Sequence, residues 1–343
     1  MDVSRGEMNQ HLVLTGACAL DTILTVPAYP QEDAKQRASS LSIRRGGNCP
    51  NTLQVLHHLS LPSSIKTHLI SALPSLSSPA ISKITSSFGP GSNVIDFSSC
   101  LHREGHSESV SSYIIRSLET GSRTVVNYND LPEMTAGEFE GIVDRLLGGG
   151  EEGDSWWFHF EGRIPETTLQ CIRHIRKVMP ANTTISVECE KPNREGLVEL
   201  AAEADVVFYS SSWAESRGYH DPESCLRGEA PSTKATLMLC TWGADGAGML
   251  IRGSGDNNKP EEDRYIHHSP APSKDGKPIK VVDTIGAGDT FIAGVLYASL
   301  CGPSSSHMMD ASKLAFAVEL ATRKVQSEGF AHLAGPEAAQ QQH

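Results

Sequence analysis

The 343-residue sequence lacks the features that would place it in a membrane or in an oxidising compartment. No stretch is long and apolar enough to span a bilayer, and residues 1–10 lack the basic and apolar blocks of a signal peptide. The eight cysteines are spread singly, without the spacing of a zinc site or a redox pair. We therefore expect reduced cysteines and a cytoplasmic protein.

An excess of positive charge is also missing. The formal net charge of −12 argues against nucleic acid or an anionic membrane as a partner, because either would need a basic face. The 14 histidines include no His-Glu-x-x-His motif, so a histidine-bound metal is not expected. Hydrophobic residues make up 38% of the chain, which suits a globular core. A phosphate-bearing ligand would have to be held by a local feature.

A glycine-rich turn leads into a helix at Gly286 to Asp289. Without Cβ atoms, the backbone amides of such a turn can approach a ligand closely. The apolar helix that follows would direct the unpaired amides of its first turn, and the positive end of its dipole, at the same place. Asp289 stands at this junction, where it can accept a proton from an attacking hydroxyl while the amides hold phosphate oxygens. The pattern predicts phosphoryl transfer, and a helix-capping role for Asp289 is the structural alternative.

The longer string Asp-Thr-x-Gly-Ala-Gly-Asp-Thr-Phe-x-Ala-Gly at 283–294 resembles the C-terminal signature of the PfkB, or ribokinase-like, family of carbohydrate and nucleoside kinases. The resemblance implies that Asp289 is the catalytic base and that the amides of Gly286, Ala287 and Gly288 form an anion hole. It also implies ATP as phosphoryl donor, Mg²⁺ at the ATP phosphates, and a K⁺ ion near Asp283.

The N-terminal part of the chain places polar residues after apolar runs. An apolar strand over 11–16 ends in Thr-Gly and is followed by Asp21, as when an open α/β sheet presents a binding residue at its edge. Turn acids such as Asp33 are common and, taken singly, are usually solvated. Together, Tyr-Pro-x-Glu-Asp at 29–33 and Arg-Gly-Gly-Asn-x-x-Asn at 45–51 resemble the sugar-binding segment of ketohexokinases, a subgroup of this family. The residues implied to bind the ketose hydroxyls are Asp21, Asp33, Gly47, Asn48 and Asn51.

Two β-rich regions add further candidates. A strand over 156–163 ends in Glu-Gly-Arg, as in ketohexokinases, which nominates Arg163 as a substrate or phosphate contact; a surface ion pair is the alternative. Two runs within 107–128 flank the turn Glu-Thr-Gly-Ser and predict a hairpin. With residues 34–43 this hairpin would form a small sheet standing off the domain as a lid, and by resemblance Arg123 would face the site.

The metal and nucleotide contacts are less well defined. Glu188 and Glu190 lie on the same face of a strand over 184–192 and would repel each other unless a cation lies between them. We therefore place them near magnesium or near a lysine. Many family members carry Asn-x-x-Glu at the end of the next strand, and residues 210–215 lack it. The turn of a hairpin over 235–251 lies beside the nucleotide in the family, although folding explains such a turn equally well. The implied nucleotide contacts are Trp242, Gly243, Asp245, Gly246, Ala247 and Gly329.

Strands and helices alternate without a tandem repeat, which predicts an α/β fold: a ribokinase-like, doubly wound central sheet with helices on both faces and a small β-sheet lid. We expect one kinase domain over 11–335, with lid strands within 27–45 and 107–128. The termini, 1–10 and 336–343, are expected to be flexible. Residues 252–280 are polar and predict an inserted loop. The pattern over 61–101 fixes no boundary.

The function implied by the resemblance is an ATP-dependent carbohydrate kinase that phosphorylates a hydroxyl of a ketose, with fructose as the leading substrate. A kinase for ribose, a nucleoside or another small polyol is the nearest alternative. A non-catalytic sugar-binding regulatory protein is an alternative from another class, and the intact turn at 286–289 argues against it. The expected partners are a small sugar and ATP. The lid strands of relatives often pair between subunits, which makes a homodimer through the lid a further expectation.

Overall fold

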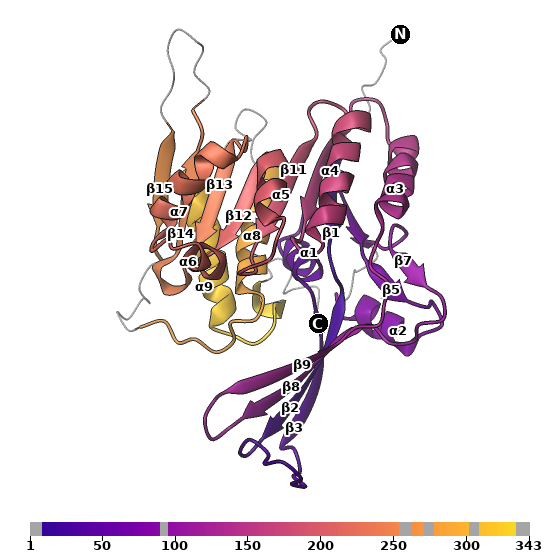
Figure 1. Ribbon diagram of the computed structural model, residues 1–343, viewed down its shortest axis with the longest axis vertical. Coiled ribbons are helices and arrows are strands. Elements are labelled where there is room, and N and C mark those ends of the chain that lie inside the picture. The colour runs from indigo at the N-terminus through magenta and orange to yellow at the C-terminus, as the bar shows by residue number, and fades with distance from the viewer. Residues whose placement is uncertain (1–8, 90–94, 254–262, 271–277, 302–308, 334–343) are drawn as a thin grey trace.

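The computed structural model describes residues 9–89, 95–253, 263–270, 278–301 and 309–333, and a nine-stranded sheet forms its body (Figure 1). The strands of this sheet are β1 (Gln10–Thr15), β4 (Ile65–Ile70), β6 (Ile95–Asp96), β10 (Ser155–Phe160), β11 (Thr184–Cys189), β12 (Val206–Ser210), β13 (Leu237–Thr241), β14 (Ala247–Ile251) and β15 (Arg264–His268). Their order is β15-β14-β13-β12-β11-β10-β1-β4-β6. Strand β14 runs antiparallel to both of its neighbours, and every other pair is parallel.

The order of the strands reverses beside β1. The chain moves from β1 outward through β4 to β6 and then returns to β10, on the other side of β1. Open α/β sheets bind their ligands at the carboxyl ends of the strands near such a reversal. The central strands are covered on both faces, and the apolar runs of β10, β11 and β12 are mostly buried, as a parallel sheet requires.

Helices cover both faces of the sheet, which confirms the predicted doubly wound α/β fold (Figure 1). Alternate residues of β1 point to opposite faces, so Leu12 and Leu14 pack into one core and Val13 into the other. The core on the side of Leu12 contains residues of α1 (Asn48–His58), α2 (Pro79–Ser86), α8 (Ala287–Leu300) and α9 (Ala311–Val325). The core on the side of Val13 contains residues of α3 (Ala136–Gly149), α4 (Pro165–Val178), α5 (Leu197–Glu203), α6 (Ser211–Ser216) and α7 (Pro222–Glu229).

The lid is a separate sheet of four strands that stands off one end of the body (Figure 1). Its order is β3-β2-β8-β9, with bounds β2 (Ala19–Val26), β3 (Ser40–Gly46), β8 (Val110–Ser117) and β9 (Arg123–Tyr128). The predicted hairpin is confirmed as β8 and β9. Gly16 to Cys18 separate β1 from β2, and β2, which carries Asp21, pairs only within the lid.

Two regions differ from the sequence interpretation. Within 61–101, where the sequence pattern fixes no boundary, residues 65–86 form a βα unit with β4, the short strand β5 (Ala72–Pro74) and α2, whose first turn is capped by Ser78. The short strand β7 (Leu101–Arg103) pairs with β5. Residues 252–280 are not a plain loop, because β15 extends the sheet beside β14. Residues 254–262 and 271–277 lie outside the described residues, as do 1–8 and 334–343, where flexible termini were expected.

Three short 3₁₀ helices complete the described elements: η2 (Ala230–Ser232), η3 (Gly243–Asp245) and η4 (Ala331–Leu333). Helix α3 begins at Ala136, where Thr135 and Glu138 form a reciprocal capping box. Among the described residues, no helix combines the length and the apolar character needed to cross a bilayer.

Candidate active site

A cavity of about 350 Å³ lies at the carboxyl ends of the central strands, between the base of the lid and the start of α8. Ligand sites typically enclose about 300 to 1,000 Å³. Four elements bring polar groups to this cavity: β2, the turn before α1, the ends of β11 to β13, and the glycine-rich turn before α8. Its lining includes Asp21, Gly47, Asn48, Asn51, Glu188, Glu190, Ser210, Thr241 and residues 284–289.

Asp289 lies in the first turn of α8 and its side chain is largely buried in this lining, with 8% of the residue exposed. Asn51 Nδ2 donates a hydrogen bond to Asp289 Oδ2 at 2.7 Å. Burial, followed by the nearby charge of Glu188, raises the pKa of Asp289 well above its usual range, while the Asn51 bond lowers it. A carboxylate with a raised pKa is suited to accepting a proton near neutral pH.

The turn before Asp289 has the shape that the sequence suggested. Gly286 has φ +77°, and a Cβ there would lie 2.5 Å from the ring of Phe330, so this position requires glycine. Gly286, Ala287 and Gly288 all line the cavity. The Ala287 amide donates to the carbonyl of Thr284 at 3.2 Å. The amides of Gly286 and Gly288 make no hydrogen bond within the described part of the chain, so they are available to an anion.

Glu188 and Glu190 are separated by an amide. Asn48 Nδ2 donates to Glu188 Oε2 at 2.7 Å and to Glu190 Oε2 at 3.0 Å. Lys191 Nζ lies 2.6 Å from the other oxygen of Glu190. The sequence left a metal or a lysine as alternatives, and in the structure a lysine pairs with Glu190 while an asparagine lies between the two acids. Because the Glu190 carboxylate, which is paired with Lys191, can only accept, the nitrogen of Asn48 faces the two acids.

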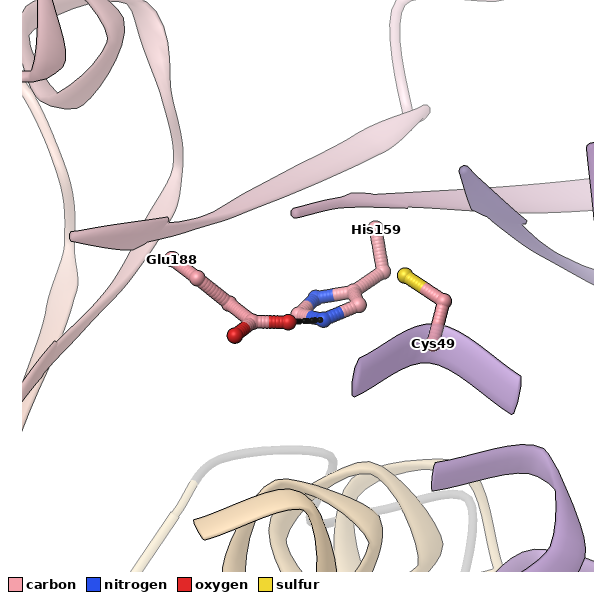
Figure 2. A group of neighbouring side chains, drawn as sticks. All are labelled: Cys49, His159 and Glu188. Atoms are coloured by element: carbon pink, nitrogen blue, oxygen red, sulfur yellow. Dashed lines mark hydrogen bonds and ion pairs between the residues drawn. The ribbon is translucent and has the colours of Figure 1, made fainter. Parts of the chain in front are cut away.

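Glu188 also belongs to a buried polar group beneath the cavity (Figure 2). Its Oε1 is hydrogen-bonded to His159 Nε2 at 3.0 Å, and His159 Nδ1 lies 2.8 Å from Ser186 Oγ. Burial raises the pKa of Glu188 to about 8 and lowers that of His159 to about 3, so the histidine is neutral at physiological pH. Cys49 Sγ, which donates to the Thr15 carbonyl at 3.3 Å, completes the group.

Two sets of residues could hold a metal ion. Among the described residues, Cys49, His159 and Glu188 place their ligand atoms within 4.8 Å of one another (Figure 2). The sulfur and nitrogen donors of this group do not suit Mg²⁺, which prefers oxygen ligands, and all three side chains already have hydrogen-bond partners. The carboxylates of Glu188 and Glu190, which line the cavity, supply the oxygen donors that Mg²⁺ prefers.

At Asp283, near which the sequence predicts a K⁺ ion, the structure brings cationic side chains to the carboxylate. Lys324 on α9 is 0% exposed, and its Nζ lies 3.1 Å from Asp283 Oδ2 and 3.0 Å from the Asp283 carbonyl oxygen. Arg44 Nη1 lies 3.4 Å from the same Oδ2, and the amides of Ile285 and Gly329 donate to the carboxylate. Burial raises the pKa of Asp283, but these partners leave it below its usual value. A lysine ammonium therefore stands where the ion was expected.

Arg163, predicted to contact substrate, lies outside the cavity of Asp289. Its Nη2 is 2.7 Å from Glu133 Oε1, and its Nε donates to the same carboxylate. Both residues line a separate cavity of about 40 Å³, which has little more room than a water molecule needs. The structure therefore shows the ion pair that was the alternative interpretation of this strand-end arginine.

Asp33 and Arg123, also predicted to contact sugar, are exposed and do not line the cavity. Asp33 has φ +60° in the loop between β2 and β3. Arg123 pairs with Arg116 across the lid, and by strand alternation it shares the lid face of Asp21. Asp21 pairs with Ser112, and Arg116, the partner of Arg123, lies four positions farther along the same strand. At about 3.3 Å per residue, Arg123 therefore lies about 13 Å farther along the lid than Asp21.

None of the six predicted nucleotide contacts lines the cavity of Asp289, although the neighbouring Thr241 does. A Cβ on Gly246 would lie 2.0 Å from the carbonyl oxygen of His268, so folding alone explains this glycine. Ala247 is fully buried in β14. Gly329 lines a different cavity, on the other side of β3. The six residues are Trp242, Gly243, Asp245, Gly246, Ala247 and Gly329.

Three polar residues beside the site, none of which lines the cavity of Asp289, were missed from the sequence. Glu161 is partly buried just after β10, accepts a hydrogen bond from the Ala17 amide at 2.9 Å, and has its pKa raised by desolvation to about 7. His159 is hydrogen-bonded to Glu188, and Arg45 donates a hydrogen bond to Asn51. The Glu-Gly-Arg string pointed to this strand end but nominated Arg163 in place of Glu161. The Arg-Gly-Gly-Asn string contained Arg45, but nothing in the sequence shows that this arginine turns inward.

Comparisons with known proteins agree with this geometry. Residues 157–334 match the family model described as pfkB family carbohydrate kinase. The chain is 29% identical to ketohexokinase from Mus musculus over 340 residues, which is 94% of this chain and 98% of that protein. The structure of Arabidopsis thaliana ribokinase complexed with ribose and ATP aligns with a TM-score of 0.71 at 18% identity, covering 97% of each chain. A nucleoside kinase from Methanocaldococcus jannaschii aligns with a TM-score of 0.65 at 17% identity, covering 96% of each.

Replacing Glu161 by glutamine should change how stability depends on pH. The pKa of Glu161 is about 7 in the folded protein against a reference value of 4.5. Between these values the unfolded chain loses a proton that the folded protein keeps, so the wild-type free energy of unfolding falls as the pH rises through this window. Glu161→Gln removes this contribution, and urea unfolding at several pH values should show a smaller fall.

The exposed Glu195 offers a matched control, because Glu195→Gln should leave the pH dependence as in the wild type. Parallel stability curves for the wild type and Glu161→Gln would contradict the assignment of Glu161 as a buried carboxyl.

Proposed function

Because the chain belongs to the pfkB family of carbohydrate kinases, we propose that it transfers the γ-phosphoryl group of ATP to a hydroxyl of a ketose, with fructose as the leading substrate. Membership makes it a sugar kinase, a phosphotransferase with an alcohol group as acceptor. The observation that carries the proposal is the Asn51–Asp289 hydrogen bond in a cavity that also contains the glycine-rich turn.

In the proposed reaction, Asp289 accepts the proton of the attacking hydroxyl, which then bonds to the γ-phosphorus as the bond to the ADP oxygen breaks. The amides of Gly286, Ala287 and Gly288 stabilise the transferring phosphoryl group. Binding of an anion there replaces the bond from Ala287 to Thr284. Asp289 Oδ2 is held by Asn51, and Oδ1 has no partner within the described residues, so Oδ1 is the oxygen that takes the proton.

The proposed sugar contacts are the polar groups that share this cavity. Asp21, Gly47 and Asn48 line the cavity together, and Asn51 joins them from farther along α1. Because the side-chain nitrogen of Asn48 donates to two acids, its side-chain oxygen Oδ1 is the atom free to accept a hydrogen bond from a sugar hydroxyl. An alignment with ketohexokinase over nearly the whole chain supports a ketose as the acceptor.

Two alternatives are retained from the comparisons. The fold is shared with a ribokinase and a nucleoside kinase, so ribose, a nucleoside or another small polyol remains the second candidate for the acceptor. The available amides and the buried Asp289 favour a catalyst over a non-catalytic sugar-binding regulatory protein. A nucleotide contact by the β13–β14 turn and by Gly329 is proposed on family resemblance.

Mg²⁺ is proposed as the ion that neutralises charge on the ATP phosphates when the nucleotide is bound, with Glu188 and Glu190 nearby. A K⁺ ion near Asp283 stays a prediction from the family resemblance, and the ammonium of Lys324 already supplies a positive charge at that carboxylate. A cytoplasmic location remains the proposal from the sequence. The eight cysteines are all free thiols, which agrees with a reducing compartment.

A homodimer through the lid is supported by one apolar face of that sheet. Strand pairing places Leu41, Ile43, Tyr113 and Val126 on the lid face opposite Asp21. Leu41 is 62% exposed and Val126 is 60% exposed. A contiguous exposed apolar surface of this kind commonly marks a protein–protein contact. We propose that a second copy of the chain covers it.

The acceptor can be identified by measuring ADP release with ATP and Mg²⁺ over a panel of fructose, other ketoses, ribose and nucleosides. We expect the highest kcat/KM for fructose, and analysis of the phosphorylated product will identify the hydroxyl. A higher kcat/KM for ribose or a nucleoside would support the second candidate. Tight sugar binding without any ADP release would support the regulatory alternative.

Asp289→Asn should reduce kcat by roughly 10² to 10⁴-fold, because the amide cannot accept the proton of the attacking hydroxyl. Fructose binding, measured by calorimetry, should stay within a few-fold of the wild type, since the substitution keeps the shape of the cavity. Asp144→Asn, on the exposed face of α3, is the matched control and should retain full turnover. Normal turnover by Asp289→Asn would exclude Asp289 as the base.

Charged substitutions on the apolar face of the lid should dissociate the dimer. Sedimentation is expected to show twice the chain mass for the wild type and the single chain mass for Leu41→Lys combined with Val126→Lys, because burying the two ammonium groups is costly. Val178→Lys, which changes an exposed apolar residue on α4, should leave the mass unchanged. A wild-type protein that sediments as a monomer would refute the proposed interface.

A further inference from the structure

Arg45 is a buried cation beside the candidate active site, and no carboxylate among the described residues pairs with it directly. It lies at the end of β3 and is 8% exposed. Its Nε donates to Ser87 Oγ at 3.0 Å, its Nη1 donates to Asn51 Oδ1 at 3.0 Å, and its Nη2 donates to Gln54. The guanidinium also lies over the ring of Phe88, with 4.3 Å to the ring centroid. Burying a charge against neutral oxygens is costly, so this arrangement needs an explanation.

Asn51 connects this cation to Asp289. A guanidinium can only donate hydrogen bonds and an ionised carboxylate can only accept them, so the oxygen of the Asn51 amide must face Arg45 and its nitrogen must face Asp289. Asn51 is itself buried and begins the second turn of α1. The result is a directed chain from Arg45 through Asn51 to Asp289 Oδ2. Hydrogen bonds in such a chain polarise and strengthen one another in a low-dielectric interior.

The surroundings of Asp289 otherwise oppose its negative charge. Burial and the charges of Glu188, Glu190 and Glu161 all raise its pKa, and the bond from Asn51 lowers it. The other titratable groups nearby are the buried thiol of Cys49, Asp21 on the lid, and Arg45 itself. Burial lowers the pKa of Arg45 to about 10, which leaves the guanidinium charged at neutral pH. Arg45 is therefore a buried positive charge that is connected to Asp289 through a single intervening side chain, that of Asn51.

We propose that Arg45 is a positioning residue for phosphoryl transfer, which acts through Asn51 to keep Asp289 charged and to leave Oδ1 free for the acceptor hydroxyl. This inference rests on the proposed role of Asp289 as the base. Asn51 then has two tasks, because it carries the effect of Arg45 and also lines the cavity.

The pH profile of kcat/KM tests this role. Arg45→Met keeps the apolar stem but removes the charge and the donors. We expect the apparent pKa of the acid limb to rise by about one pH unit. The value of kcat/KM should then fall about tenfold at pH values below this pKa and recover at higher pH. The KM for the sugar should change little. Ser87→Ala, which removes a different bond of Arg45 and leaves the bond to Asn51, should keep the wild-type acid limb.

Chemical rescue gives a second readout. Arg45 also lines a cavity of about 540 Å³ beside Phe330, which offers a small cation access to the space left by Arg45→Ala. Millimolar guanidinium chloride should restore part of the activity of Arg45→Ala and shift its acid limb back, whereas equimolar sodium chloride should not. If the Arg45 variants fail to fold, Asn51→Leu must move the acid limb upward in the same way, because it interrupts the same chain.

An unmoved acid limb in Arg45→Met, or in Asn51→Leu when the arginine variants do not fold, overturns the inference. If Asp289→Asn is inactive and the acid limb of Arg45→Met is unmoved, Arg45 has only a structural role and the proposed function stands. If Asp289→Asn turns over normally, both the proposed function and the role of Arg45 are wrong.

Discussion

The hydrogen bond between Asn51 and Asp289 joins the two halves of the candidate site. It links α1, which follows the lid, to α8, which follows the glycine-rich turn, although 238 residues separate the two partners in the chain. Thr52 adds a second link by donating to the carbonyl of Asp289 at 3.3 Å. Asp289 is buried beside other carboxylates, so the amide of Asn51 supports its charge where solvent cannot. The proposed base depends on this contact for both its orientation and its protonation state.

The sheet explains why so many acids meet at one place. Parallel strands end at the same edge, and β10 and β11 each carry a glutamate at or beyond that edge. Glu188 is buried and Glu161 is partly buried there, and their hydrogen-bond partners are Asn48 and an amide of the β1–β2 connection. Such a cluster of acids with raised pKa is costly to stability, and folded proteins keep such groups most often at functional sites. The backbone amides at the start of α8 have the opposite polarity, because they attract an anion into the cavity where the acids meet.

The sequence was sufficient for the fold class, for the hairpin β8–β9, for the helix after the glycine-rich turn, and for bringing Asp21, Asn48, Asn51 and Asp289 to one cavity. Local patterns determine the hairpin and the glycine turn, because both depend on neighbours in the chain, whereas the shared cavity was implied by the family resemblance. The contacts that the sequence misplaced depend on which way a side chain turns in the folded protein. Arg163 was expected at the substrate and binds Glu133, and Arg45 turns inward to Asn51.

The most direct test of the central claim is a crystal structure of the protein with a ketose, Mg²⁺ and a non-hydrolysable ATP analogue. If Asp289 is the base, one hydroxyl of the sugar will lie about 2.6 to 3.2 Å from Asp289 Oδ1, in line with the γ-phosphorus, while Oδ2 keeps its bond to Asn51. A sugar bound with no hydroxyl in reach of Asp289, or a γ-phosphate far from the amides of Gly286 and Gly288, would contradict the claim.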